Sequence, residues 1–261
     1  MLILRAILRL IRLSSSLLGP LAVFLPMLVR TKDLGLSFGK AVPLLFIGMC
    51  TFIANDLDDI EKDRLNHPER PLPSRHLSPE VAAVLYFVSL AAALFSTRYF
   101  IPYAIAFWYY GLVTLSISYR YIVECLPSIK TLYVAAASSV PVLIVATSYP
   151  NEPKLFAVAA TVFLLTLGRE ICGDILDRAG DAISYLHKFK PTYLAIASFC
   201  IQLAGLLLLV FQIRKPWEII DLLAMTLLLT LSSVFWFKLG RFRQATLLMK
   251  IQFFVGLYFL L

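Results

Sequence analysis

Almost the whole chain consists of long apolar stretches separated by short polar segments. Most of them approach the length of about 20 residues that a helix needs to cross a bilayer. They predict nine transmembrane helices, near residues 10–30, 41–59, 81–97, 101–119, 129–149, 154–174, 192–212, 217–237 and 244–261. The connections leave little room for a separate soluble domain. We therefore predict an all-α integral membrane protein, a single domain over residues 1–261, with its helices bundled around a central cavity.

Composition and the distribution of charge support this multi-pass class. Only 15% of the residues are charged, against roughly 25% in soluble domains. The alternative for residues 1–30 is a cleaved signal peptide. The first stretch ends in Met27-Leu28-Val29-Arg30 rather than in small residues, which favours an anchored helix.

Basic residues predict the orientation of the chain. With the N-terminus in the cytosol, fifteen of the 24 Lys and Arg residues fall in cytosolic segments and seven in external ones. This bias agrees with the positive-inside rule. The same bias and attraction to anionic headgroups explain the net charge of +8, so membrane lipids and no nucleic acid are expected as partners. The sequence does not identify which membrane holds the protein.

Nine of the sixteen acidic residues fall in two short windows, residues 55–63 and 170–181, at the cytosolic ends of the second and sixth predicted spans. Carboxylates in or beside a bilayer are costly, so such clusters indicate a functional site. Acids at the C-terminal end of a helix also oppose its dipole, so capping does not explain them.

Spacing arranges the first window into a helical face. Asn55, Asp59 and Asp63 are four apart, and Asp56 lies three before Asp59, which places their side chains on successive turns. Asp58 and Glu61 are predicted to point away from this face into solvent.

The second window has the same kind of spacing. Asp174, Asp177 and Asp181 step by three and four, with Glu170 one turn before Asp174. Clustered carboxylates repel one another unless a cation neutralises them, and hard oxygen ligands suit Mg²⁺. The metal ligands predicted are Asn55, Asp56, Asp59, Asp63, Asp174, Asp177 and Asp181.

A proline-rich loop over residues 66–79 follows the first window. Prolines at 68, 71, 73 and 79 exclude a regular helix and predict a stiff, ordered loop. Arg70 and Arg75 lie on it, and arginine binds phosphate oxygens in a planar, bidentate way. A cation site next to these arginines predicts that the protein binds a diphosphate group.

These residues resemble the signatures of the UbiA-type membrane prenyltransferase superfamily. The first signature is similar to Asn55-Asp56-x-x-Asp59-x-x-x-Asp63 followed by Arg70-Pro71-Leu72-Pro73-Ser74, and the second to Asp174-x-x-Asp177-x-x-x-Asp181. The resemblance covers essentially the whole chain. It implies a Mg²⁺-dependent enzyme with a cytosolic-side active site that ionises a prenyl diphosphate and transfers the prenyl group to a lipophilic acceptor.

The resemblance also implies roles for single residues. Asp59, Asp63, Asp174 and Asp177 would act in catalysis, and Arg70 and Lys130 would hold the diphosphate. Many members carry a basic residue and Thr-Leu-Pro after the second signature, where this chain has only Lys188 or Lys190 as the basic residue. An Asn often follows the position of Lys130, and this chain has Thr131 there. Both departures bear on the identity of the acceptor rather than on binding of the diphosphate.

Ionisation would produce an allylic carbocation that aromatic faces stabilise in a water-excluding cavity. The candidate cavity residues are aromatic side chains of the fourth and fifth spans, for which ordinary packing is the alternative: Trp108, Tyr109, Tyr110, Tyr119, Tyr121 and Tyr133.

Three functions remain open on the sequence. A prenyltransferase needs a separate acceptor, whereas a UbiA-type terpene cyclase would fold a prenyl diphosphate such as farnesyl diphosphate onto itself. A cation transporter is the third, but transporters place charges near the bilayer midplane rather than at helix ends. Neither the prenyl length nor the acceptor follows from the sequence.

Overall fold

The computed structural model describes residues 2–126, 129–176, 188–256 and 260–261, and these residues form helices joined by turns and loops, with no β-strand. Nine helices of 14 residues or more lie in this part of the chain, so the predicted count of nine is approximately right. Seven segments are long and apolar enough to span a membrane: six of these helices and the stretch Leu13–Thr31. The prediction of an all-α membrane protein is confirmed. The helices are α1 (Leu2–Leu10), α2 (Leu13–Ser16), α3 (Leu18–Thr31), α4 (Leu34–Asp58), α5 (Ile60–Asn66), α6 (Pro79–Phe100), α7 (Tyr103–Cys125), α8 (Lys130–Ser148), α9 (Pro153–Leu176), α10 (Pro191–Val210), α11 (Pro216–Phe237) and α12 (Phe242–Gly256).

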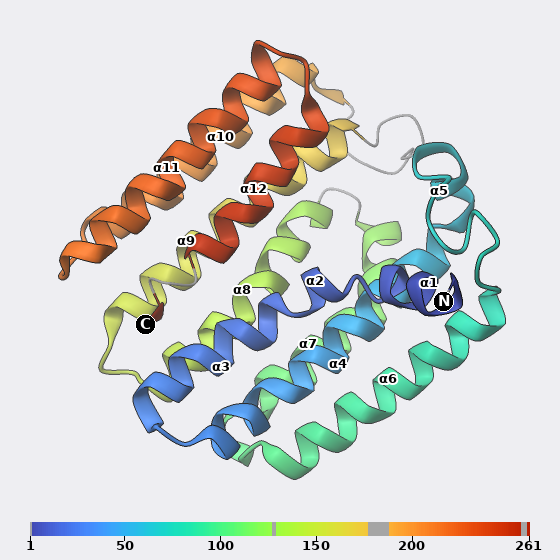
Figure 1. The fold of residues 1–261 in the computed structure, drawn as a ribbon, viewed down its shortest axis with the longest axis horizontal. Coiled ribbons are helices and arrows are strands. Elements are labelled where there is room, and N and C mark those ends of the chain that lie inside the picture. Colours follow the sequence, from blue (N-terminus) through green and yellow to red (C-terminus); the bar gives the residue numbers. More distant parts are fainter. Residues whose placement is uncertain (1, 127–128, 177–187, 257–259) are drawn as a thin grey trace. The chain divides into compact units, whose positions relative to one another are not determined.

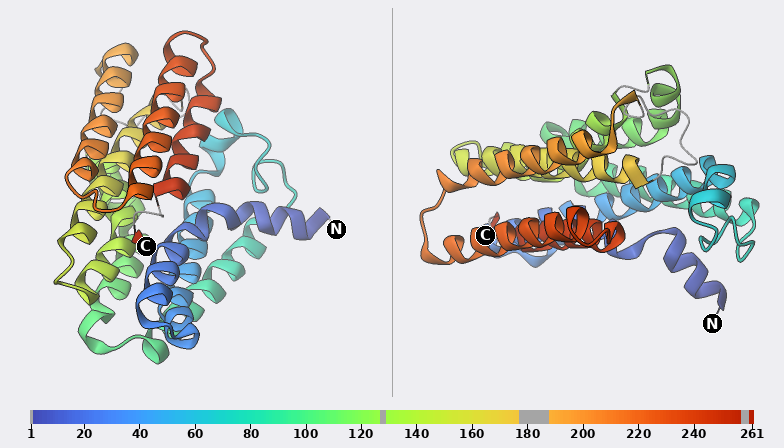
Figure 2. Two further views of the ribbon diagram at one scale, coloured as in Figure 1. Left: turned by 60° about the vertical axis from the view of Figure 1, so that its left-hand side comes forward. Right: turned by 90° about the horizontal axis from the view of Figure 1, so that it is seen from above.

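The chain forms two compact units. In the first, α4 packs against α3, α6 and α7, as Figure 1 shows for the blue and green helices. In the second, α9 packs against α8, α10 and α12, and α11 pairs with α12. The pairing of α11 with α12 is also visible in both views of Figure 2.

Local signals explain where several helices begin. The Asp33 side chain accepts a hydrogen bond from the Leu36 amide, so α4 starts seven residues before the predicted start at 41. Ser78 caps α6 in the same way, and Pro79 occupies its first turn, where a missing N–H costs nothing.

The first predicted span needs a correction. It was expected to run from residue 10 to 30, but the chain breaks at Arg12, which has a left-handed backbone (φ 44°). Helix α1 is therefore separate from α3. Its Ala6 and Leu10 pack in a buried cluster with Leu72 and Leu77 of the proline-rich loop.

The proline-rich loop contains no α-helix, as predicted. Turns hold it: the Arg70 amide donates to the His67 carbonyl at 3.0 Å, and the Ser74 hydroxyl donates to the Arg70 carbonyl at 2.6 Å. Arg75 takes a left-handed backbone (φ 61°). The buried leucines and these hydrogen bonds hold Arg70 beside the end of α4.

Candidate functional site

The first acidic window lies on the last turn of α4 and on α5. A single non-helical residue, Asp59, separates the two helices. The Asp59 amide still donates to the Asn55 carbonyl at 2.9 Å, and the Asp63 amide to the Asp59 carbonyl at 2.7 Å. Asn55, Asp59 and Asp63 therefore follow one another on successive turns, as their spacing predicted.

Asp56 and Asp63 are buried, each with 2% of its surface exposed. An Arg12 nitrogen lies 2.5 Å from an oxygen of Asp56, and an Arg70 nitrogen lies 2.5 Å from Asp63 and 3.7 Å from Asp56. Burial raises the pKa of Asp63, and the hydrogen bond from Arg70 opposes this shift. The two guanidinium groups thus neutralise the buried part of the motif.

Sequence reasoning did not identify Arg12 as a site residue. Arg5, Arg9 and Arg12 are spaced by four and three and read as one basic face of a helix. In the structure Arg5 and Arg9 are exposed, whereas the backbone break turns Arg12 toward Asp56, with its guanidinium 5.2 Å from the ring centre of Phe52. No signal in the local pattern separates Arg12 from the other two.

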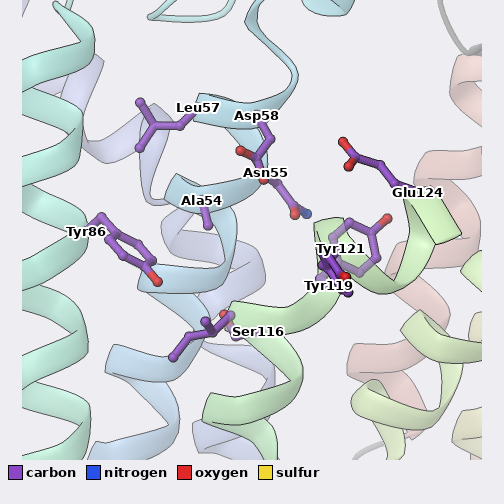
Figure 3. A pocket seen from close by; sticks show the side chains of 10 residues that line it. Ala54, Asn55, Leu57, Asp58, Tyr86, Ser116, Tyr119, Tyr121 and Glu124 are labelled. Atoms are coloured by element: carbon purple, nitrogen blue, oxygen red, sulfur yellow. The ribbon is translucent and has the colours of Figure 1, made fainter.

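A pocket of about 540 Å³ opens beside the same turn of α4 (Figure 3). This volume lies within the range of small-molecule sites, roughly 300–1,000 Å³. The side chain of Asn55 extends toward α7, which contributes two tyrosines and a glutamate to the lining. The pocket is lined by Ala54, Asn55, Leu57, Asp58, Tyr86, Ser116, Ile117, Tyr119, Tyr121 and Glu124.

Asp58 was expected to point away from the site into solvent. It is exposed, as expected, but it also lines the pocket together with Asn55. The reason is helical geometry, since Asp58 lies three residues after Asn55 and shares its face. Glu61 is also exposed as predicted and pairs with Arg64 at 2.7 Å.

The aromatic candidates separate into two groups. Tyr119 and Tyr121 line the pocket. Tyr109 lies outside it, fully buried, with its hydroxyl donating to the Lys40 carbonyl at 2.7 Å. Tyr110 is exposed and also lies outside the pocket. For Tyr109 this is the role in packing that was the alternative.

The remaining two aromatic candidates contribute no side chain to this pocket. Trp108 is half-buried on α7 beside Phe107, with ring centres 4.7 Å apart. Its indole N–H has no hydrogen-bond partner among the described residues. Tyr133 is half-buried on α8 in the second unit.

The second acidic window begins near the C-terminal end of α9. Asp174 is 5% exposed, and the Lys130 ammonium, from the first residue of α8, lies 2.9 Å from its carboxylate. Arg169 and Glu170 form an ion pair with each other. Asp177 and Asp181 lie outside the described residues. Lys188, the first described residue after them, is exposed.

Both motifs therefore carry oxygen donors. Among the residues that the structure describes, no three His, Cys, Asp or Glu side chains lie close enough together to hold a metal ion. The side chain of Asp59, 40% exposed, lies 3.8 Å from Lys62. The buried motif carboxylates that the structure describes, Asp56, Asp63 and Asp174, contact Arg12, Arg70 and Lys130.

Solved structures share this fold. A UbiA homologue from Aeropyrum pernix K1 matches with a TM-score of 0.74 at 16% identity, covering 94% of this chain and 96% of that one. A UbiA homologue from Archaeoglobus fulgidus, solved with DMAPP and Mg²⁺, matches with a TM-score of 0.62 at 15% identity, covering 97% and 98%. At such identities the likeness concerns the fold alone.

Curated sequences give a further match. The digeranylgeranylglyceryl phosphate synthase of Thermococcus sibiricus is 32% identical over 129 residues, which are 49% of this chain. The chain spans about half the length of this relative, 46%. The profile of the UbiA prenyltransferase family matches residues 15–260 and thus includes both acidic motifs, the proline-rich loop and Lys130. The chain belongs to the UbiA prenyltransferase family.

Proposed function

We propose that the protein is a Mg²⁺-dependent membrane enzyme that transfers a prenyl group from a prenyl diphosphate to a lipophilic acceptor. The first motif carries this proposal. Two of its carboxylates contact Arg70 of an ordered loop, beside a pocket lined by Asn55 and Asp58. Family membership over residues 15–260 gives the reaction class.

The donor atoms fit Mg²⁺. Asn55 offers an amide oxygen to the pocket and Asp58 a carboxylate, which are the hard oxygen ligands this ion prefers. We propose that Asn55, Asp56, Asp59, Asp63, Asp174, Asp177 and Asp181 hold the metal. When bound, Mg²⁺ neutralises the diphosphate and acts as a Lewis acid on the leaving group.

The basic and aromatic side chains have separate roles in this proposal. Arg70, Lys130 and Lys188 hold the oxygens of the diphosphate and stabilise the charge it gains as the carbon–oxygen bond breaks. The rings of Tyr119 and Tyr121 line the pocket and stabilise the allylic cation through their π faces. In this proposal both acidic motifs act on the same diphosphate. The oxygen donors of each motif and the membership of the UbiA family support this assignment.

The activity for which the curated relatives are named favours a transferase over a cyclase. The Thermococcus sibiricus protein is named for a product with two geranylgeranyl groups on glyceryl phosphate. We therefore propose a prenylated glyceryl phosphate as the acceptor and geranylgeranyl diphosphate as the donor. Fifteen of the 24 basic residues support a cytosolic N-terminus, which places both motifs on the cytosolic side.

The decisive experiment measures products. Purified protein is incubated with Mg²⁺ and farnesyl, geranylgeranyl or longer prenyl diphosphates, with and without geranylgeranylglyceryl phosphate. A prenylated acceptor lipid that forms only when the acceptor is present supports the proposal. Cyclic hydrocarbons or alcohols formed in its absence identify a cyclase instead.

Metal removal gives the first prediction. Because the donor set is oxygen-rich, excess EDTA is expected to abolish product formation, and added Mg²⁺ or Mn²⁺ to restore it, measured by the same product assay. Undiminished turnover in excess EDTA contradicts the metal assignment.

The role of Arg70 gives the second prediction. Arg70→Ala is expected to weaken prenyl diphosphate binding by about 1.5–3 kcal/mol, the contribution of a hydrogen bond to a charged group. The dissociation constant at saturating Mg²⁺ measures it. Arg64→Ala is the matched control, because Arg64 is exposed and pairs with the exposed Glu61. Equal losses in both variants would show that Arg70 acts through surface charge alone.

A further inference from the structure

In the part of the two motifs that the structure describes, three carboxylates are buried, and each contacts a basic side chain of the protein. Asp56 contacts Arg12, and Asp63 contacts Arg70. In the second unit, Asp174 contacts Lys130. A carboxylate buried without a counter-charge strongly destabilises a protein. These bases therefore supply the positive charge that a bound metal would otherwise supply.

At Asp56 the competition between base and metal is direct. One oxygen of this carboxylate lies 2.5 Å from Arg12 and 3.7 Å from Arg70. A divalent cation that binds this oxygen would compete with the Arg12 guanidinium for it, because two positive charges held so close to each other repel.

The position of Arg12 suits a group that moves. It stands at the break between α1 and α2, and about a third of its side-chain surface is exposed (32%) while Asp56 is enclosed (3%). Its neighbours Leu10 and Ile11 are anchored in the buried cluster beneath the proline-rich loop. A change of the Arg12 side-chain rotamer therefore needs no movement of its anchored neighbours.

We propose that Arg12 is a stand-in cation that couples metal binding to diphosphate binding. It neutralises Asp56 when no metal is bound and therefore weakens binding of the metal alone. A diphosphate offers the displaced guanidinium a new anionic partner, so metal and diphosphate bind cooperatively. This inference rests on the proposed function, and it makes Arg12 a positioning residue for the metal site.

The test measures metal affinity rather than activity. Mn²⁺ is titrated into purified Arg12→Gln protein without diphosphate, and unbound Mn²⁺ is followed by electron paramagnetic resonance. Because the substitution frees Asp56, Mn²⁺ is expected to bind about 10-fold more tightly than to the wild type, within the usual range of coupling between sites. Binding of radiolabelled inorganic pyrophosphate at saturating Mn²⁺ is expected to weaken by a similar factor.

A stability measurement adds an independent readout. Without metal, Asp56 in Arg12→Gln is buried and keeps only the more distant Arg70, at 3.7 Å, so this variant is expected to unfold at a lower temperature than the wild type. Mn²⁺ should raise its unfolding temperature by more than it raises that of the wild type, since tighter binding stabilises more. Arg9→Gln is the matched control: Arg9 is exposed three residues away, and neither affinity should change.

Each outcome decides between specific alternatives. Unchanged or weaker Mn²⁺ binding by Arg12→Gln overturns the inference and leaves Arg12 a structural counter-ion. If this variant does not fold, Arg12→Lys carries the test, because it keeps the charge but loses the planar fork. A few-fold tighter Mn²⁺ binding is then expected, and wild-type affinity counts against the inference. If Mn²⁺ does not bind the wild type even with pyrophosphate, the proposed function itself fails.

Discussion

Replacing Asp59 or Asp174 with alanine is expected to reduce product formation by about 10²–10³-fold or more, the range for removing one group that stabilises charge in a transition state. Asp59 stands between the two turns that carry Asn55 and Asp63. Asp174 contacts Lys130, a proposed diphosphate ligand. Each substitution therefore removes a carboxylate that the proposed ionisation step needs.

The double variant distinguishes one shared site from two separate ones. If both motifs serve the same diphosphate, Asp59→Ala combined with Asp174→Ala loses little more than either single variant, because residues that act as a unit are strongly non-additive. Losses that multiply would indicate independent roles.

The measurement is product formation by detergent-solubilised protein, with size-exclusion chromatography as the check on folding. Glu61→Ala is the appropriate control, because Glu61 lies in the same acidic window but is exposed and pairs with Arg64. Asp58→Ala is not suitable, since Asp58 lines the pocket. An Asp174→Ala variant with normal turnover would remove the second motif from the site.

Gly168→Ala is expected to destabilise the second unit by about 1–3 kcal/mol, the usual cost of inserting an atom into a packed core. A β-carbon at this position would lie 2.5 Å from the Gln202 side chain and 2.7 Å from the Ser198 carbonyl oxygen. Gln202 can adjust, but the backbone carbonyl of α10 cannot move without the helix. The Ser198 hydroxyl also donates to the Gly168 carbonyl at 2.7 Å, and this contact between α9 and α10 would be strained.

Thermal unfolding in detergent, followed by circular dichroism, measures this effect. Gly173→Ala is the matched control on the same helix, because nothing lies within 4 Å of the added β-carbon. There alanine should be neutral or slightly stabilising, since glycine is the weaker helix former. A Gly168→Ala protein as stable as the Gly173→Ala protein would show that α10 yields to the added methyl group.

Much of the fold could be predicted because its signals are local. The length of an apolar stretch, the prolines at 79, 191 and 216 and the loop prolines fix where helices begin and stop, independently of what they pack against. The four-residue spacing of Asn55, Asp59 and Asp63 survives a one-residue break because the backbone hydrogen bonds continue through it.

The sequence by itself determined a helical membrane protein with two acidic motifs and an arginine loop, because periodicity and composition act within one helix or loop. Only the tertiary structure decided which faces meet. It turned Arg12 onto Asp56, placed Asp58 in the pocket and assigned Tyr109 to packing. These contacts join residues up to 69 positions apart. They depend on how one helix packs on another, which no local pattern encodes.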